Sequence, residues 1–259
     1  MATHFARGIL TEGRLASARI SSACHSEALT LPEHRRTRFL ASRALLAELM
    51  FMLYGTSELP DIITQPEGRP VFADPDLPRF SIAYAGNIIG VALTTEGDCG
   101  LDMELQRATR SFHGGNAHED YPLSSNEKLW VRNQNDPVEA RAQLITLRQS
   151  IRKLCGCASD DASMLQLLPG SGRLRAAQAT LVEALSDAED VLIWSIAVTP
   201  AIERMKIWEF DSQQGWRSLP DVPERANESA ARLMRLISLP AEKHSPLADP
   251  IRVIMMKQE

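Results

Sequence analysis

The sequence lacks any uninterrupted apolar run approaching the roughly 18 residues that a membrane-spanning helix needs. The N-terminus also lacks the pattern of a signal peptide, in which a basic segment precedes an apolar one. We therefore expect no membrane partner, and we predict a soluble protein of the cytoplasm.

Cysteine is scarce and scattered. The four cysteines are Cys24, Cys99, Cys155 and Cys157. No histidine or second cysteine pair accompanies the last two, so the sequence predicts neither a zinc site nor a disulfide framework. We interpret all four as reduced thiols.

An excess of positive charge is also missing. The 28 Lys and Arg residues are outnumbered by 33 Asp and Glu residues, which gives a formal net charge of −5. This balance argues against a general nucleic-acid binder, but it leaves room for a local basic groove that binds a phosphorylated ligand.

The length and composition allow two lobes or one large α/β unit, since the chain has 259 residues of which 44% are hydrophobic. We expect two halves. The predicted N-terminal lobe covers residues 1–106 and the C-terminal lobe residues 107–218. A C-terminal extension, partly helical and then irregular, covers residues 219–259.

In the first half, residues 4–10 have the pattern of a short strand, and a long helix is predicted from Leu31-Pro32-Glu33 to a stop at Gly55. The apolar residues at helical spacing, which we expect to be buried, are Phe39, Leu46, Leu49, Met50 and Leu53. The same helix begins with a dense group of basic residues, which are His34, Arg35, Arg36, Arg38 and Arg43. These side chains either form a solvated face or bind phosphate, helped by the helix dipole.

Extended chain follows. A turn at residues 65–72 presents Arg69 at its tip, and residues 80–84 and 88–95 read as a hairpin. Glu96-Gly97-Asp98 then turns into a third strand. We expect these three consecutive strands to form one antiparallel sheet.

The third strand carries two carboxylates at alternate positions, Asp102 and Glu104. On an extended strand both point to one face, while Leu101, Met103 and Leu105 point into a core. Two adjacent anions repel unless a cation lies between them, and hard oxygen ligands suit Mg²⁺. The alternative is an ordinary solvent-facing edge of an amphipathic strand.

The second half repeats the order of helix, hairpin and strand without a sequence repeat. Residues 107–123 read as a mobile connection, and Ser124 and Glu127 form a capping box that gives Glu127 a purely structural role as an alternative. A helix from Asp136-Pro137 to Gly156 follows. Its two faces are predicted to carry Leu144, Leu147, Ile151 and Leu154 in the core and Thr146, Gln149 and Lys153 opposite them.

Beyond that helix, residues 164–169 and 173–180 are predicted to form a hairpin, and residues 191–199 a central strand. Residues 205–210 and Trp216 suggest edge strands, and residues 224–239 have the pattern of an amphipathic helix.

With these pieces in order, the chain resembles the 4′-phosphopantetheinyl transferase superfamily in its two-lobed, Sfp-type form, over roughly residues 30–160. The family's Gly-Lys-Pro turn is similar to Gly68-Arg69-Pro70, and its Gly-x-Asp-x-Glu strand is met by Gly100, Asp102 and Glu104. Its Phe-Ser-x-x-Glu segment resembles residues 123–127, and its long helix motif is met at Thr146, Lys153 and Gly156.

This resemblance implies an α/β (α+β) fold in which one chain is a pseudo-dimer of two similar lobes, each a small antiparallel sheet packed on a long helix. It also implies a monomer that transfers 4′-phosphopantetheine from coenzyme A to a serine of an acyl, peptidyl or aryl carrier protein and releases 3′,5′-ADP.

The resemblance also implies roles for individual residues. Asp102 and Glu104 would hold Mg²⁺, Lys153 would contact phosphate, and Glu127 would be a metal-water partner or base. The residues expected to bind coenzyme A, which is a co-substrate, are Arg38, Arg43, Arg69, Pro70 and Tyr84.

Two positions depart from the family pattern. Tyr84 stands where the family has a histidine that meets a coenzyme A phosphate, and a phenol can still donate one hydrogen bond. Gln149 stands where the family has a third acidic residue; it keeps a carbonyl oxygen but cannot accept a proton at neutral pH. General-base work would then need Glu127 or a metal-bound water.

The sequence leaves three functions open. The first is an active transferase, and the second is a degenerate homologue that binds coenzyme A or a carrier protein without efficient turnover. The third is an unrelated Mg²⁺-dependent phosphodiesterase.

Overall fold

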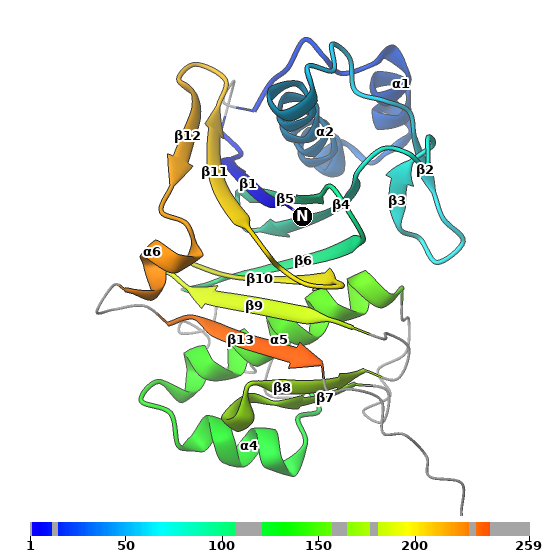
Figure 1. The fold of residues 1–259 in the computed structure, drawn as a ribbon. Helices are drawn as coiled ribbons and strands as arrows, with labels where there is room; N and C mark the ends of the chain where they lie inside the picture. Colours follow the sequence, from blue (N-terminus) through cyan, green and yellow to red (C-terminus); the bar gives the residue numbers. More distant parts are fainter. Residues whose placement is uncertain are drawn as a thin grey trace, which may run out of the picture.

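The computed structural model describes residues 2–11, 15–106, 121–156, 165–176, 181–227 and 232–238. Within this part of the chain, two sheets lie face to face, and each carries one long helix on its outer side (Figure 1). The fold is α+β, as predicted.

The first sheet has five strands. In spatial order they are β12 (Gly215–Leu219), β11 (Met205–Asp211), β1 (Thr3–Ile9), β5 (Ile88–Thr94) and β4 (Arg79–Ala85). The pair β1 and β11 is parallel and the others are antiparallel. The strand predicted at residues 4–10 and the predicted hairpin are therefore confirmed.

The second sheet has six strands. In spatial order they are β6 (Asp98–Leu105), β10 (Leu192–Thr199), β9 (Glu183–Ala188), β13 (Met234–Ser238), β8 (Arg173–Ala176) and β7 (Leu165–Leu168). A short 3₁₀ turn, η1 (Pro169–Ser171), joins β7 to β8 as the predicted hairpin requires. The strand predicted at residues 191–199 is confirmed as β10, which lies between β6 and β9.

Two long helices cover the outer faces. Helix α2 (Glu33–Tyr54) follows the shorter α1 (Ser22–Thr30), and α5 (Pro137–Cys155) follows α4 (Ser125–Arg132). Gly55 and Gly156 adopt left-handed conformations and end α2 and α5 where the sequence predicts. Pro32 is the N-cap of α2 rather than a residue of its first turn.

Three layers of apolar side chains hold these elements together. Leu45, Leu49 and other residues of α2 pack on the outer face of the first sheet, and Leu144 and Leu147 of α5 pack on the second. A middle layer that includes Phe5 and Trp194 fills the space between the sheets. Burial of these side chains is the main stabilising term of the fold.

Smaller elements complete the described chain. The strands β2 (Ile62–Thr64) and β3 (Pro70–Phe72) form a two-stranded hairpin, which is the turn predicted at residues 65–72. Helix α6 (Val222–Ala226) is a short turn after β12.

Three predictions are wrong. The strand β6 does not extend the sheet of β4 and β5; it pairs with β10 in the second sheet, because a sharp turn at residues 95–97 carries the chain across the inter-sheet layer. Residues 224–239 are not one helix, since β13 occupies the end of this range and pairs with β8 and β9. Of the two predicted edge strands, β12 lies at an edge of the first sheet, but β11 lies inside it between β12 and β1.

The division into lobes at residues 106 and 107 stays a prediction, as does the pseudo-dimer. The two sheets exchange strands across this position, because β6 belongs to the second sheet and β11 and β12 to the first. The predicted mobile connection at 107–123 lies mostly outside the described residues.

Candidate functional site

The strand β6 alternates as its sequence predicts. Cys99, Leu101 and Met103 lie in the layer between the two sheets. Asp102 lies opposite Ser195 of β10, whose hydroxyl is 2.7 Å from the Thr146 hydroxyl of α5. The face of β6 that carries the two carboxylates is thus the face against which α5 packs.

Gly100 allows α5 to lie directly on β6. A Cβ atom at this position would be 2.0 Å from the Ser150 carbonyl oxygen and 2.7 Å from the Leu154 nitrogen, which are both backbone atoms of α5. A side chain would push the helix away from the strand. The glycine of the Gly-x-Asp-x-Glu pattern therefore sets the distance between these two elements.

This close approach brings Lys153 to Asp102. The Lys153 ammonium donates hydrogen bonds to the Leu101 carbonyl at 2.8 Å and to Asp102 Oδ1 at 2.9 Å. Burial raises the pKa of Asp102, Lys153 opposes that rise, and Glu104 adds to it. The side chain of Lys153 stays 40% exposed, so its ammonium also faces solvent.

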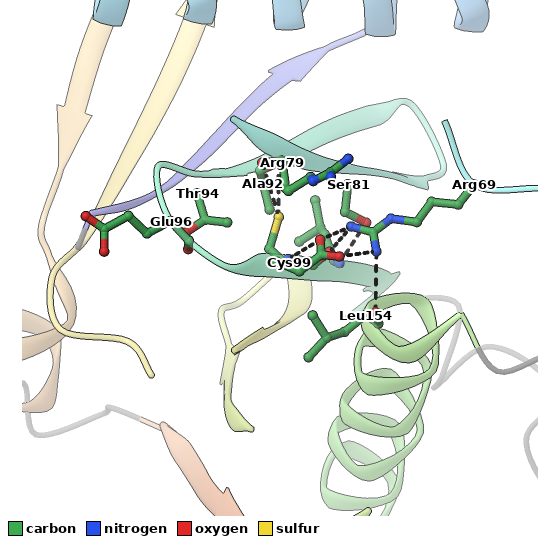
Figure 2. A network of polar contacts seen from close by, with 10 residues as sticks. Arg69, Arg79, Ser81, Ala92, Thr94, Glu96, Cys99 and Leu154 are labelled. Carbon is green, nitrogen blue, oxygen red and sulfur yellow. Dashed lines mark hydrogen bonds and ion pairs between the residues drawn. The ribbon is translucent and has the colours of Figure 1, made fainter. Parts of the chain in front are cut away.

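Arg69 lies inside the structure rather than at an exposed tip (Figure 2). Its guanidinium reaches from the β2–β3 hairpin to Asp98 of β6, with Nη1 2.7 Å from Oδ2 and Nη2 bonded to Oδ1. Nη2 also donates to the Cys99 carbonyl at 3.0 Å, and Nη1 lies 3.4 Å from the Leu154 carbonyl of α5.

A cavity of about 310 Å³ lies between the β2–β3 hairpin, β4 and α5, and we name it the hairpin cavity. Of the residues predicted for the site, it is lined by Arg69, Pro70, Gln149 and Lys153. Phe80, Ser81 and Ile82 of β4 form another wall. The Gln149 amide nitrogen lies 3.3 Å from the Tyr121 hydroxyl.

Three other predicted residues gather around the turn between β4 and β5. Arg38 donates to the Gly86 carbonyl, and its guanidinium lies 5.9 Å from the centroid of the half-exposed Tyr84 ring. Arg43 is buried, lies 4.6 Å from the centroid of the Phe39 ring, and has its pKa lowered by burial. None of the three lines the hairpin cavity.

The turn between β4 and β5 lies over the C-terminal end of β6. A Cβ at Gly86 would come within 2.4 Å of Leu105 Cδ1. The Leu101 amide donates to the Ser81 hydroxyl at 3.0 Å, which links the middle of β6 to β4. The Arg38–Tyr84 group and the hairpin cavity therefore lie along the same edge, where β4 and β6 meet.

Glu127 occupies a different place. It is fully buried, accepts a hydrogen bond from the Ser124 amide at 2.7 Å, and forms an ion pair with Arg148. The predicted capping box is confirmed. The role of Glu127 as base or metal-water partner stays a prediction, and it would require the ion pair with Arg148 to open.

Sequence reasoning missed two residues of this region. The sequence pattern assigns Asp98 to a turn, and only its acidic charge beside a predicted strand indicates a partner for Arg69. No sequence pattern indicates a role for Tyr121, because its contact with Gln149 joins a loop to the middle of a helix.

Asp102 and Glu104 are the candidate metal ligands on β6. Within the described ranges, no three His, Cys, Asp or Glu side chains are grouped closely enough to enclose a metal ion. Mg²⁺ needs only one or two carboxylates when water and substrate phosphates complete its shell. Asp102 and Glu104, which are close enough for their charges to interact, fit that simpler mode of binding.

Comparison with known proteins places the chain in a family. No family model matches it. It is 63% identical over 244 residues to the uncharacterized protein YieE of Escherichia coli (strain K12), covering 94% of this chain and 98% of that protein. The chain belongs to the YieE family. The YieE of a second strain, Escherichia coli O6:H1, matches to the same extent.

A second group of relatives is more distant than YieE. The chain is 32% identical over 115 residues to the 4′-phosphopantetheinyl transferase AcpT of Escherichia coli (strain K12), covering 39% of this chain and 55% of AcpT. AcpT of Salmonella typhimurium is 25% identical over 122 residues, which cover 47% of this chain and 60% of AcpT. This YieE-family chain is thus distantly similar, over part of its length, to a phosphopantetheinyl transferase.

No helix in the described part of the chain combines the length and apolar character needed to cross a bilayer.

Proposed function

We propose that this protein transfers the 4′-phosphopantetheine group of coenzyme A to a serine hydroxyl of an apo carrier protein in the cytoplasm. The observation that carries the proposal is the contact of Lys153 with Asp102 beside the hairpin cavity. It combines one exposed cation, one carboxylate pair and a cavity, and the distant similarity to AcpT supports the same reaction.

The reaction is a displacement at phosphorus. The serine oxygen forms a bond to the phosphorus atom that bears the pantetheine group, and the bond from that phosphorus to the oxygen of 3′,5′-ADP breaks. The ADP oxygen leaves with the bonding electrons. The serine proton passes to solvent, because Gln149 cannot accept it. Glu127 would serve as the base only if its ion pair with Arg148 opened.

Charge stabilisation is the main task of the residues at the site. Lys153, held at the Leu101 carbonyl, would contact a phosphate oxygen with the remaining hydrogen of its ammonium. Asp102 and Glu104 would hold Mg²⁺, which neutralises charge on phosphate oxygens when bound. Arg38, Tyr84 and Pro70 would line the path of coenzyme A along the edge where β4 and β6 meet.

The carrier protein would approach from α4 and the start of α5. Carrier proteins are usually acidic, and Arg132 of α4 and Arg141 of α5 are the basic residues that we propose as contacts. Arg141 also donates to the Tyr121 carbonyl at 3.2 Å.

The test is direct. The protein is incubated with coenzyme A, Mg²⁺ and several apo carrier proteins, and each carrier is weighed by mass spectrometry. A carrier that gains one phosphopantetheine group supports the transferase, and Asp102→Ala and Lys153→Ala should abolish the gain. Release of 3′,5′-ADP without any carrier would support a phosphodiesterase instead.

A second candidate is a homologue that binds coenzyme A or a carrier protein without efficient turnover. Gln149 favours it, because this residue lines the hairpin cavity without supplying a negative charge. Binding of coenzyme A in calorimetry, with no modified carrier in any assay, would favour this candidate.

The variant Gln149→Glu separates the two candidates. It adds an anion one helical turn before Lys153 and should tighten Mg²⁺ binding, so an otherwise intact site should work at lower Mg²⁺ or faster. The rate of carrier modification is measured against Mg²⁺ concentration. If the variant binds Mg²⁺ no better and stays as slow as the parent, the binding-only candidate is preferred.

A further inference from the structure

We infer that Arg69 is a positioning residue: its guanidinium joins the β2–β3 hairpin to β6 and α5, and so fixes two walls of the hairpin cavity. This inference deepens the proposed function. Of the measurements described below, only the binding of coenzyme A rests on that proposed function. It replaces the expected direct contact of Arg69 with coenzyme A.

The donors on the two terminal nitrogens of Arg69 are fully used. Its two terminal nitrogens carry four hydrogens, and the structure gives them four acceptors. Nη1 faces Asp98 Oδ2 and the Leu154 carbonyl, and Nη2 faces Asp98 Oδ1 and the Cys99 carbonyl (Figure 2). A ligand phosphate would have to displace one of these partners. The Arg69 side chain is only 14% exposed, which agrees with an internal role.

The four acceptors belong to two elements other than the hairpin. Asp98 and Cys99 begin β6, and Leu154 is in the last turn of α5, where backbone carbonyls lack partners within the helix. An arginine at a helix C-terminus both satisfies such a carbonyl and interacts favourably with the helix dipole. One side chain therefore ties three segments that are far apart in the sequence.

The geometry of the cavity depends on this junction. The hairpin supplies residues 67–70 of the lining, and α5 supplies Gln149, Arg152, Lys153 and Gly156. Lys153 directly precedes Leu154, so the contact of Arg69 with Leu154 fixes the helical turn that presents the Lys153 ammonium to Asp102. Loss of the junction would let the hairpin and the end of α5 move apart.

The test uses Arg69→Gln, Arg69→Lys, Asp98→Asn and the double variant Arg69→Gln/Asp98→Asn in the full chain. Hydrogen exchange of the amides at residues 67–69 and 153–156 reports on the junction, and calorimetry reports the Kd for coenzyme A. Arg173→Gln is the matched control, because Arg173 is an exposed arginine on β8 outside the hairpin cavity.

For a positioning residue, both Arg69→Gln and Asp98→Asn should speed exchange in both segments and raise the Kd about tenfold or more, since small misplacements in a site have large effects. The double variant should be no worse than the worse single variant, because the pair acts as a unit. Arg69→Lys should behave like Arg69→Gln, because an ammonium cannot form the paired hydrogen bonds that a guanidinium forms with a carboxylate. Arg173→Gln should match the parent.

The inference is overturned if Asp98→Asn keeps the exchange rates and the Kd of the parent while Arg69→Gln alone weakens binding, or if Arg69→Lys restores the parent Kd. Either result would mean that the charge of Arg69 touches the ligand. If the parent itself binds no coenzyme A, the proposed function fails, and the exchange data still decide: coupled acceleration in both segments supports the inference, and unchanged exchange overturns it.

Discussion

Gly100 has no side chain, and this lets the backbone of α5 lie directly on β6. We expect Gly100→Ala to separate the helix from the strand. The added Cβ would lie 2.0 Å from the Ser150 carbonyl oxygen, so α5 and β6 would have to move apart. We expect a loss of about 2 to 3 kcal/mol in the free energy of unfolding, typical of overpacked sites, together with loss of the Lys153–Asp102 contact. Urea unfolding measures the first effect.

Gly170→Ala is the matched control for this substitution. The nearest atom to a Cβ at Gly170 is Trp130 Cδ1 at 3.6 Å, which is an ordinary van der Waals distance. Gly170→Ala should leave stability within about 0.5 kcal/mol of the parent. Equal losses in the two variants would contradict the steric argument at Gly100.

His4 gives stability a dependence on pH. Burial lowers its pKa below the usual 6.5, and its Nδ1 accepts a hydrogen bond from the Trp208 indole at 3.2 Å, which requires the neutral ring. The unfolded chain binds this proton more readily, so the free energy of unfolding should fall as the pH drops below 6.5. His4→Gln keeps an acceptor but does not titrate, and it should flatten this part of the stability profile in urea titrations at successive pH values.

At the scale of elements, helix ends were predictable and strand partners were not. Gly55, Asp136 and Gly156 act on the residues beside them, so the ends of α2 and α5 follow from local sequence. The pairing of β6 with β10 places Leu105 opposite Leu192, and no local sequence pattern indicates a partner so far along the chain. The family resemblance implied that Asp102 and Lys153 serve one site, but it did not predict the hydrogen bond between them.

The strand β13 shows how periodicity misleads. In the sequence, Leu236 of β13 and the flanking leucines at positions 233 and 239 have the spacing of a helix. In the structure Leu236 and Ser238 are buried while Arg235 and Ile237 are exposed, which is the alternation of a strand. In a segment this short both periods fit, and pairing with β8 and β9 decides between them.

The elements α4 and α5 are joined by the buried ion pair of Glu127 and Arg148. Glu127→Ala should lower the free energy of unfolding by about 3 to 5 kcal/mol, because it leaves the Arg148 charge buried without its partner. The double variant Glu127→Leu/Arg148→Met should recover much of that loss, since no buried charge remains. Urea unfolding of the three proteins gives the comparison. A double variant as unstable as Glu127→Ala would contradict this account.

At the scale of the whole molecule, Arg7 of β1 links the two sheets. It donates to Glu189, in the turn between β9 and β10, at 2.7 Å and to Glu209 of β11 at 3.1 and 3.2 Å. Glu189 also accepts a hydrogen bond from the Trp194 indole at 2.8 Å. Ion pairs and the apolar layer between the sheets therefore hold them at the same interface.

Arg7→Leu should cost about 2 to 4 kcal/mol in the free energy of unfolding, because two carboxylates lose a mostly buried partner. Arg217→Leu is the control, since Arg217 contacts the same Glu209 but its side chain is 70% exposed. That exposed pair should contribute less than about 1 kcal/mol. Thermal and urea unfolding would show the difference, and similar losses in both variants would speak against a special role of the inter-sheet contact.

The exchange of strands between the sheets also bears on synthesis of the protein. Strand β1 ends at Ile9, but its neighbour β11 begins only at Met205, so β1 leaves the ribosome long before β11. At roughly 5 to 20 residues per second, the interval is on the order of 10 to 40 s. During that time one edge of β1 has no native neighbour, and unpaired strand edges invite pairing with other chains. The nascent protein must therefore pass through a period in which an edge of β1 is open to aggregation.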